Sequence, residues 1–432
     1  MEVKPGYKQT EVGVIPEDWE VPKVEAIIKE ISMGPFGSDI TVSNFISSGV
    51  PVLNGANVAS ERLVDFFENF VTPAKARSLK KAVARRGDIV VTHRGTIGQI
   101  AYIPENSEFD RYVVSQSQFR VRFAKEAVIP EWVVLYFHSD NGAKRLLERK
   151  GHTGVPAIAQ PTRTFRNLSV PVPPLPEQRA IATALSDVDG LLGGLGRLIA
   201  KKRDLKQAAM QQLLTGQTRL PGFSGEWESF LFGDVADPGR SWSFTGGPFG
   251  SNLKSSDYTE SGVRIIQLQN IGDGEFKDDY EIYTSVAKAD ELLSCNIYPG
   301  EIILSKMGDP VARACLIPSR HDRYLMCSDG IRLAVDSSRF ANNFVFAQIN
   351  APDFRNRAAN AGTGSTRKRI GLTELRNLQL KCPPSLSEQT AIAEVLTEMD
   401  AELAVLEQRR EKTRALKQAM MQELLTGRIR LV

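Results

Sequence analysis

The sequence predicts an α+β protein built from two copies of one globular domain, each followed by a long helix. A repeat provides the first evidence: LKQAAMQQLLTG at residues 205–216 returns as LKQAMMQELLTG at residues 416–427. Around it, residues 177–220 and 388–431 are identical at 23 of 44 positions. Between the repeats lie short β-branched runs, densely punctuated by glycine and proline, which is typical of small sheets. An internal repeat of this length sets the architecture before any local motif does.

The repeated stretches have the apolar spacing of packed helices. The apolar positions are Leu185, Val188, Leu192, Leu195 and Ile199 in the first copy and Leu396, Met399, Leu403 and Leu406 in the second. Steps of three and four residues form an a/d seam. Prolines precede both stretches, and Gly216 and Gly427 follow them as helix stop signals. We therefore predict two long spacer helices, within residues 173–216 and 382–432.

Charge indicates how the two helices pair. The leading half of the second helix holds the acidic residues Glu388, Glu394, Glu398, Asp400, Glu402 and Glu407. The trailing half of the first holds the basic residues Arg197, Lys201, Lys202, Arg203 and Lys206 beside Asp204. Antiparallel packing places acidic beside basic residues. We predict an antiparallel coiled coil with a pseudo-two-fold axis; the alternative is that these charges are solvated helix faces.

The globular segments, residues 1–172 and 217–381, repeat more faintly. The matched segments are GPFGS (34–38 and 247–251), GDIVVTHRG with GEIILSKMG (87–95 and 300–308), and YVVSQSQFR with YLMCSDGIR (112–120 and 324–332). Framework residues match, whereas the polar residues between them differ. We predict α+β domains with curved, mostly antiparallel sheets, whose different surfaces bind two different ligands of one kind. GPFGS is either a turn needed for folding or a close backbone approach to a ligand.

The order of these segments is nearly circular. TEVGVIPEDWE at residues 10–20 looks like the end of the linker TGQTRLPGFSGEWE at residues 215–228. The second helix leads into TGRIRLV, so joining the last residue to the first would complete a second linker. The predicted order is therefore domain, helix, domain, helix.

Composition and motifs exclude several classes of protein. The 432 residues are 42% hydrophobic and 24% charged, without an apolar run long enough for a membrane span. The N-terminus lacks a signal-peptide core, and four cysteines without a CxxC pair fit a reducing cytoplasm. Four histidines show no metal-binding spacing. A net charge of +3 leaves nucleic acid open as a partner.

Catalytic motifs are also missing from the sequence. The Pro-Pro steps occur only in VPPLP and CPPSL, so the D/N-P-P-Y/F motif of an adenine methyltransferase is absent. No GxxxxGK[ST] phosphate loop is present. We predict that this chain has no catalytic residue, cofactor or metal of its own.

Three stretches and the paired LLTG endings carry a family resemblance. YKQTEVGVIPEDWE at 7–20, PPLPEQRAIA at 173–182 and SEQTAIAEVL at 387–396 resemble the specificity subunit of a type I restriction-modification system. The resemblance covers essentially the whole chain, including its circular repeat. It implies that the globular domains are target recognition domains, each reading one half of a bipartite DNA site. It also implies that the helices fix the distance between the half-sites.

The same resemblance implies the partners. They are double-stranded DNA, two methyltransferase subunits that carry S-adenosylmethionine, and restriction (translocase) subunits that use ATP and Mg, with no membrane. The subunit itself would be non-catalytic and cytoplasmic. The alternatives are a self-sufficient DNA-modifying enzyme, disfavoured by the missing motifs, and a coiled-coil scaffold that binds only protein. Salt-dependent DNA binding would separate the specificity subunit from the scaffold.

The first helix departs from the second at four glycines. Gly190, Gly193, Gly194 and Gly196 stand where the second helix has Ala401, Ala404, Val405 and Glu407. Each internal glycine costs about 0.5–1 kcal/mol relative to alanine. The glycines therefore either weaken or bend this helix or admit very close packing.

Candidate DNA contacts are polar residues near the matched framework that differ between the copies. Base edges are distinguished by donors and acceptors in the major groove. The candidate base readers are Asn54, Asn57, Arg62, His93, Arg94, Ser115, Gln116, Ser117 and Gln118 in the first domain and Gln267, Gln269, Asn270, Lys306, Ser328 and Asp329 in the second. The candidate phosphate contacts are Thr153, Thr162, Arg163, Thr363, Thr366, Arg367, Lys368 and Arg369. For each of them, an ordinary surface or turn residue is the alternative.

Overall fold

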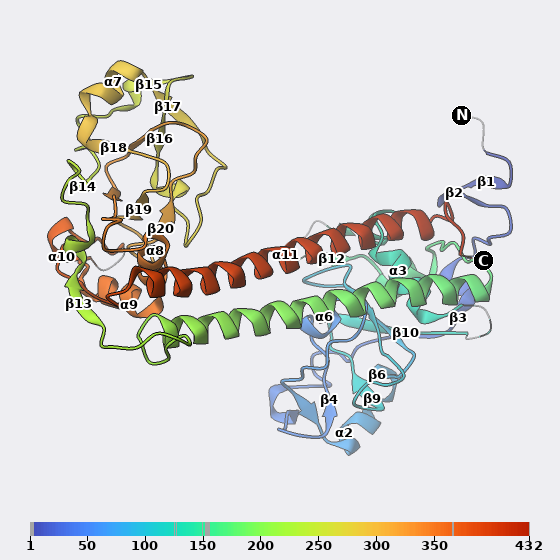
Figure 1. The fold of residues 1–432 in the computed structure, drawn as a ribbon. Coiled ribbons are helices and arrows are strands. Elements are labelled where there is room, and N and C mark those ends of the chain that lie inside the picture. Colours follow the sequence, from blue (N-terminus) through green and yellow to red (C-terminus); the bar gives the residue numbers. More distant parts are fainter. Residues whose placement is uncertain are drawn as a thin grey trace. The chain divides into compact units, whose positions relative to one another are not determined.

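The computed structural model describes residues 4–431 except 125, 127, 149, 152–155 and 365–366. It divides into two compact units. Unit 1 comprises Met1–Gly196 and Arg409–Val432, and unit 2 comprises Arg197–Gln408. The helices α6 (Leu175–Leu213) and α11 (Leu386–Leu424), each of 39 residues, contribute one part to each unit (Figure 1). The two long helices predicted from the repeat are thus confirmed.

Unit 1 holds twelve strands and five short helices besides its parts of α6 and α11, counted over the described residues. The strands are β1 (Tyr7–Thr10), β2 (Gly13–Pro16), β3 (Ile28–Met33), β4 (Val50–Pro51), β5 (Phe70–Val71), β6 (Val83–Arg85), β7 (Ile89–Thr92), β8 (Ile100–Tyr102), β9 (Arg111–Val113), β10 (Gln118–Phe123), β11 (Lys150–Gly151) and β12 (Ala157–Ile158). The helices are α1 (Val24–Ile27), α2 (Pro73–Ser78), α3 (Pro130–His138), α4 (Asp140–Leu147) and α5 (Pro161–Arg166).

Unit 2 has a corresponding set of elements. Its strands are β13 (Glu228–Leu231), β14 (Phe244–Gly246), β15 (Tyr258–Thr259), β16 (Val263–Ile266), β17 (Ile282–Thr284), β18 (Asn296–Ile297), β19 (Ile302–Ser305), β20 (Ala314–Leu316), β21 (Tyr324–Met326), β22 (Gly330–Leu333) and β23 (Gln379–Cys382). Its short helices are α7 (Val286–Glu291), α8 (Asn342–Asn350), α9 (Pro352–Ala361) and α10 (Leu372–Arg376).

Each unit is built on a four-stranded antiparallel sheet with the same strand order. The order is β3-β10-β7-β8 in unit 1 and β14-β22-β19-β20 in unit 2. Unit 2 adds a five-stranded sheet, β15-β17-β16-β21-β18, in which only β16 and β21 are parallel. In unit 1 the corresponding strands form the separate pairs β4–β5 and β6–β9. The predicted α+β class with mostly antiparallel sheets is confirmed in both units.

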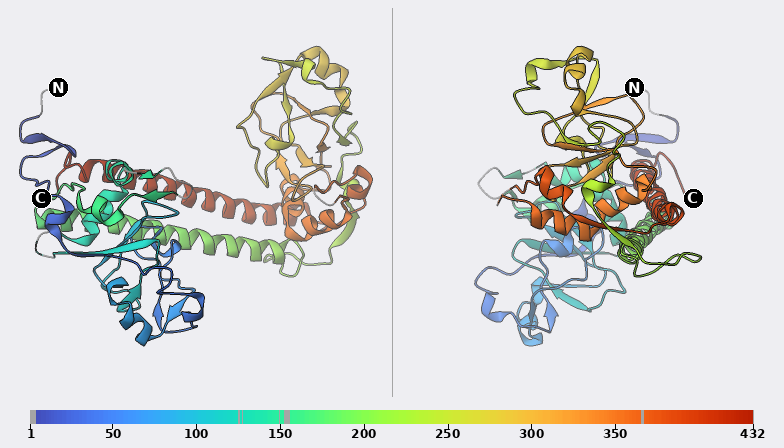
Figure 2. Two further views of the ribbon diagram at one scale, coloured as in Figure 1. Left: turned by 180° about the vertical axis from the view of Figure 1, so that it is seen from behind. Right: turned by 60° about the vertical axis from the view of Figure 1, so that its left-hand side comes forward.

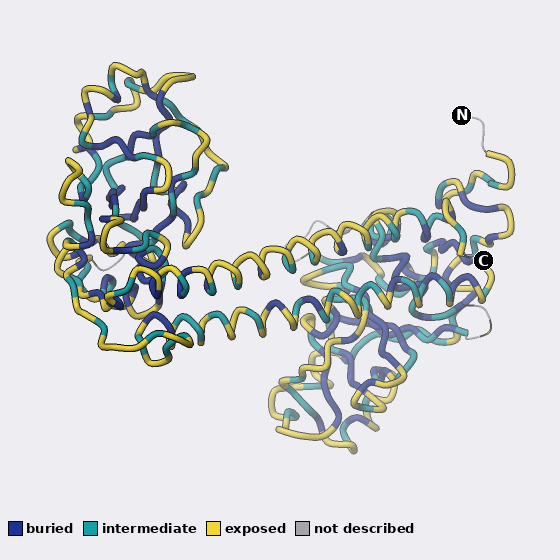
Figure 3. The backbone as a smooth tube through the Cα atoms, in the orientation of Figure 1, coloured by how far each residue is buried: buried dark blue, intermediate teal, exposed yellow. Residues whose placement is uncertain are grey.

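The strand β7 is buried on both faces, which explains its unbroken apolar run. Ile89 and Val91 pack into one core with α3 and the start of α6, whereas Val90 packs into a second core with β6 and β9. The same alternation recurs along β19 in unit 2. Figure 3 shows the buried segments running through the interior of each unit, with exposed loops around them. The framework residues match between the copies because they fill these cores.

Within each unit, α6 and α11 lie side by side in antiparallel orientation (Figures 1 and 2). In unit 2 the ion pairs are Lys202–Glu402 (2.6 Å), Arg203–Glu407 (2.5 Å) and Lys206–Asp400. In unit 1, Lys417 of α11 pairs with Asp189 of α6 at 2.8 Å. The predicted antiparallel pairing of acidic with basic residues is therefore confirmed. Such partly exposed pairs contribute about 0–1 kcal/mol each, so the apolar seam contributes most of the stability.

The near-circular repeat has a structural counterpart where each long helix begins. In unit 2, Arg219 of the linker donates to both carboxylate oxygens of the buried Glu388, at 2.5 and 2.6 Å. In unit 1, Arg430 donates to both oxygens of the buried Glu177, at 2.5 and 2.8 Å. Trp19 Nε1 also donates to Glu177, at 3.0 Å. One continuous linker thus supplies this contact in unit 2, and the two ends of the chain supply it in unit 1.

Three of the four glycines of α6 are not packing sites. A Cβ added at Gly190, Gly194 or Gly196 would meet nothing within 4 Å. The close-packing interpretation is therefore wrong for these three residues, although α6 stays continuous across them. Among the described residues, no helix is both long and apolar enough to span a bilayer.

Candidate nucleic-acid interface

Three segments meet at one end of the four-stranded sheet in each unit. They are the motif loop (34–38 and 247–251), the reader turn (115–118 and 327–330) and the strand-end loop (93–98 and 306–312). In unit 1, β3 and β7 end where β10 begins, because both pair antiparallel with β10. The same register brings the ends of β14 and β19 to the start of β22. The sheet therefore positions these loops identically in both units.

Backbone hydrogen bonds join the three segments in the same way in each unit. The bonds are Gly34 N to Gln118 O (2.8 Å) and His93 N to Ser117 O (2.9 Å) in unit 1, and Gly247 N to Gly330 O (2.8 Å) and Lys306 N to Asp329 O (2.7 Å) in unit 2. These bonds do not depend on side chains. The side chains at the same positions can therefore differ between the units without altering the backbone.

The first glycine of GPFGS is required by this arrangement. A Cβ at Gly34 would lie 1.9 Å from Ser115 O, and a Cβ at Gly247 would lie 1.7 Å from Cys327 O. Real Cβ atoms do not approach a carbonyl oxygen so closely, so any other residue would separate the motif loop from the reader turn. For this glycine, the folding interpretation of GPFGS is correct.

In unit 1 the reader turn and strand-end loop present several of the predicted readers. Gln116 and Arg94 are exposed, and His93 and Ser117 are half-buried. The His93 ring lies with Nε2 3.3 Å from Gln116 O. Burial lowers the pKa of His93 below its ordinary value, against the opposing hydrogen bond to the Gln116 carbonyl. The imidazole is therefore neutral at pH 7, with Nε2–H donating to the Gln116 carbonyl and Nδ1 left as an acceptor.

In unit 2 the corresponding positions carry different side chains. Lys306, Ser328 and Asp329 are half-buried, and Asp329 Oδ1 accepts a hydrogen bond from Arg369 at 2.8 Å. Backbone bonds from Gly308 N to Lys368 O (3.1 Å) and from Ile370 N to Lys306 O (3.0 Å) hold the basic segment against the strand-end loop. The exposed residues of that segment are Thr363, Arg367, Lys368 and Arg369. The structure thus brings the predicted readers and phosphate contacts of unit 2 together.

Three predicted readers are wrong, because their side chains are structural. Asn57 and Asn270 are each 1% exposed, and Gln118 is fully buried. The Nδ2 of Asn57 donates to Val64 O and Phe66 O, and Asn270 makes the equivalent pair of bonds in unit 2. Gln118 Nε2 donates to Asn54 O at 2.9 Å. Each amide satisfies buried backbone groups and has no free face for a base.

The remaining predicted residues are placed unequally. Asn54 and Gln267 lie beside the reader turn, but Asn54 Oδ1 caps its own turn by accepting from Ala56 N at 2.9 Å. Gln269 is exposed next to Gln267, and Arg163 is exposed on α5. Arg62 lies over the Tyr102 ring, at the end of β8 away from the reader turn, so the structure does not bring it to the other readers. Thr153 and Thr366 lie outside the described residues.

Comparison with known proteins assigns the chain to a family. Residues 16–197 and 250–414 match the model of the type I restriction modification DNA specificity domain. The chain belongs to this family. It is a specificity subunit with two recognition domains, one in each unit.

Relatives and solved structures agree over nearly the full length. The MjaVIII and MjaX specificity subunits of Methanocaldococcus jannaschii are 24% and 25% identical over 439 residues, covering 96% and 98% of this chain and 94% and 96% of theirs. The S subunit of M. genitalium has the same fold, with a TM-score of 0.57, 14% identity and 98% of both chains covered. A chain from a structural study of type I R-M complex assembly gives 0.59, with 20% identity and 96% and 99% covered.

The recognition domain of unit 1 has a cationic cavity that sequence reasoning missed. The cavity holds about 540 Å³, and its basic residues are Arg77, Lys80, Lys81, Arg85, Arg111, Arg120 and Arg122, with Glu30. Arg120 bonds Glu30 at 2.5 Å, and Arg122 bonds Asp88 at 2.7 Å. The hydrogen bond from Arg120 holds the pKa of Glu30 below its ordinary value. The run KARSLKK at 75–81 was the signal in the sequence.

The other five basic residues of this cavity have no carboxylate within ion-pair distance among the described residues. The equivalent positions of the unit 2 recognition domain are Asp290, Leu293, Ser294, Tyr298 and Arg323. There Arg323 pairs with Asp290 at 2.7 Å. The same place on the fold thus carries five uncompensated positive charges in unit 1 and none in unit 2.

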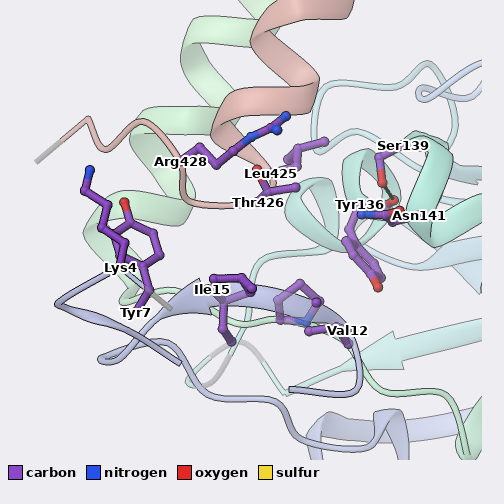
Figure 4. A pocket seen from close by; sticks show the side chains of 13 residues that line it. Lys4, Tyr7, Val12, Ile15, Tyr136, Ser139, Asn141, Leu425, Thr426 and Arg428 are labelled. Carbon is purple, nitrogen blue, oxygen red and sulfur yellow. Dashed lines mark hydrogen bonds between the residues drawn. The ribbon is translucent and has the colours of Figure 1, made fainter. Parts of the chain in front are cut away.

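A second cavity in unit 1, of about 500 Å³, lies between the β1–β2 hairpin, α3 and the end of α11 (Figure 4). Tyr136 lines it, is 2% exposed, and its hydroxyl has no hydrogen-bond partner among the described residues. Burial raises the pKa of Tyr136 to about 12. In unit 2 the equivalent residue of α8 is Gln348, which donates to Leu214 O (2.7 Å) and Lys381 O (2.9 Å). This cavity is apart from the reader turn.

Proposed function

We propose that the two recognition domains each read one half of a bipartite site in double-stranded DNA, and that the chain directs its partner subunits to that site. One observation carries the proposal. The same hydrogen-bonded framework presents Arg94 and Gln116 in unit 1 but Lys306 and Asp329 in unit 2. Identical scaffolds with different donors and acceptors suit the reading of two different base sequences.

The side chains divide into base readers and phosphate contacts. Gln116 can bond adenine and Arg94 guanine in the major groove, while Asp329 can accept from cytosine. His93, Ser117, Gln269 and Ser328 supply further donors and acceptors beside them. Arg163, Thr363, Arg367, Lys368 and Arg369 suit phosphate oxygens, which position the protein without specifying sequence. The cationic cavity of unit 1 would extend this phosphate contact.

The chemistry belongs to the partners in this proposal. Two methyltransferase subunits carry S-adenosylmethionine, and restriction (translocase) subunits use ATP and Mg. The specificity chain contributes no catalytic residue and acts on DNA in the cytoplasm. Methyl transfer to DNA by the purified chain alone would contradict this division of roles.

Methylation mapping tests the function directly. The chain is co-expressed with its methyltransferase subunit, and methylated adenines are located across the host genome. We expect one bipartite sequence with methylation in both halves. Replacing residues 13–167 by the matching domain of a relative should change one half-site only. A change in both half-sites would contradict independent reading, and DNA binding without any sequence preference would favour the scaffold alternative.

A further inference from the structure

Two phenylalanines are highly exposed in the motif loops, at the end of each four-stranded sheet that carries the reader turn. Phe36 is 79% exposed and Phe249 is 83% exposed, more than any other phenylalanine of the described residues. Both occupy the third position of GPFGS in their motif loops. Leaving a phenylalanine side chain in water forgoes the favourable free energy of burying it. Two equivalent loops therefore leave the same apolar side chain in solvent.

The motif loop holds each ring on a fixed backbone. The preceding residues, Pro35 and Pro248, are buried. Asp39 N donates to Phe36 O at 2.8 Å, and Asn252 N donates to Phe249 O at 2.8 Å. With the anchoring bond of the first glycine to the reader turn, the backbone on both sides of each phenylalanine is held by hydrogen bonds. The backbone that carries each ring is therefore ordered before any ligand arrives, which lowers the entropic cost of binding.

The fold does not account for the ring. Proline and glycine already build the loop, and neither phenylalanine belongs to a buried core. A partner protein covering the ring would also cover the reader turn, because the motif loop is bonded to it. In unit 1 a Cβ at Gly37 would lie 3.2 Å from the side-chain oxygen of Gln116, an exposed reader. The ligand that reaches the readers therefore also reaches the ring.

We propose that Phe36 and Phe249 are aromatic wedges that stack against bases, one in each half-site, without selecting their identity. The inference rests on the proposed function above. The readers differ between the units, whereas the ring and its loop are the same, as a role common to both half-sites requires. Aromatic rings stack on every base, and apolar wedges inserted at base steps unstack and kink DNA. The flanking small residues, Gly37 and Gly250, let the backbone come close to the duplex.

The test uses the full chain assembled with its methyltransferase subunits and a duplex carrying the mapped site. Phe36→Ala and Phe249→Ala are measured singly and together. Each should weaken binding about 5- to 150-fold, the range for removing one ring that stacks on a base. Cognate and noncognate duplexes should weaken alike, so their affinity ratio stays unchanged. With 2-aminopurine placed along each half-site, but not at the adenine that the methyltransferase flips out, the rise in fluorescence on binding should disappear only in the half-site of the altered unit.

Matched variants separate stacking from other effects. Phe66→Ala removes another exposed ring of unit 1, 67% exposed and outside the motif loop, and should leave binding unchanged. Phe36→Trp keeps a stacking ring and should retain affinity. The thermal stability of each variant should equal that of the parent, because the rings lie outside the cores.

The outcomes distinguish the inference from the function. If the parent complex binds and methylates its site but both alanine variants match it in affinity and fluorescence, the wedge is wrong and the function stands. Variants that bind DNA normally but fail to assemble with methyltransferase would show that the rings contact protein, which also overturns the wedge. A parent complex without sequence preference would overturn both proposals.

Discussion

Unit 1 and unit 2 hold the same four-stranded sheet, yet one carries a cationic cavity where the other is neutral. Sheet positions such as Ile89 and Ile302 are buried and share the core of their unit with long helices, so substitutions there are constrained by packing. Rim positions such as Lys80 and Leu293 are exposed and free to diverge. The comparison shows that the packed framework is the same in the two units, whereas the exposed residues around it differ in charge.

A second difference lies under the helices. Gln348 joins α8 to the end of α6 and to β23, whereas Tyr136 at the same position of α3 has a hydroxyl without a partner among the described residues, beside a cavity. A third lies at the helix starts, where unit 2 uses a continuous linker and unit 1 uses both chain ends. The units thus share a topology but differ in the hydrogen bonds that hold their short helices and linkers to the long helices.

The helix-start carboxylates provide the largest expected effect. Glu388→Ala and Glu177→Ala each remove a buried carboxylate that accepts two hydrogen bonds from a partly exposed arginine. Each lost charge-assisted bond costs about 1.5–3 kcal/mol, and Arg430 keeps its bonds to Asp18. Hydrogen exchange should accelerate in the altered unit. Because Arg430 and Trp19 belong to the chain ends, Glu177→Ala alone should also expose those ends to limited proteolysis. Glu226→Ala, at an exposed position, is the control. If both variants were cleaved at the same rate, the chain ends in unit 1 would not depend on Glu177 for their protection.

The cationic cavity predicts unequal salt dependence between the units. Replacing Arg77, Lys80, Lys81, Arg85 and Arg111 by glutamine should lower the slope of log affinity against log salt by about 0.9 for each phosphate that is no longer neutralised, up to about 4.5. Arg323→Gln, at the equivalent and already paired position of unit 2, should change the slope by less than about 0.9. Filter binding at several salt concentrations measures both. If the five substitutions left the slope equal to that of the parent protein, the cavity would not face DNA.

The Gln348 and Tyr136 pair predicts opposite responses to losing a polar group. Gln348→Leu leaves the carbonyl groups of Leu214 and Lys381 without their amide donor. The free energy of unfolding of unit 2 should fall by about 1–3 kcal/mol. Tyr136→Phe removes a hydroxyl that has no partner among the described residues, so unit 1 should keep or slightly gain stability. Hydrogen exchange resolves the two units separately. A destabilised Tyr136→Phe would mean that the hydroxyl is bonded in solution.

The helices provide the smallest expected effect. Gly190→Ala and Gly194→Ala should each stabilise α6 by about 0.5–1 kcal/mol, because the added methyl groups meet open space. The reverse change in α11, Ala401→Gly at an exposed position, should destabilise it by a similar amount. Thermal unfolding followed by circular dichroism measures these shifts. Loss of stability at Gly190 would indicate that the glycine serves a bound partner.

Much of the architecture could be predicted because it depends on the periodic spacing of apolar residues and on the internal repeat. The seam through Leu185 and Leu396 predicted the long helices, and the opposite charges of Lys202 and Glu402 predicted their antiparallel pairing. Among the candidate readers, Gln116 was found as an exposed residue, but Gln118, two positions later, is buried. Period alone does not separate them, since both look like polar turn residues.

The duplicated framework, the two long helices and their antiparallel orientation could be predicted, because they depend on local periodicity, capping signals and the order of charges along the chain. Which polar side chains stay free for contact depends on the folded arrangement of the chain. Gln118 is engaged by the carbonyl of Asn54, and Asn57 by those of Val64 and Phe66, partners that the chain brings close only after the sheet forms. The cationic cavity likewise gathers Lys80, Arg85 and Arg111 from three separate elements. The burial of a side chain and its hydrogen-bond partners depend on the whole fold. A polar group is available for recognition only where it does not already bond a buried backbone group.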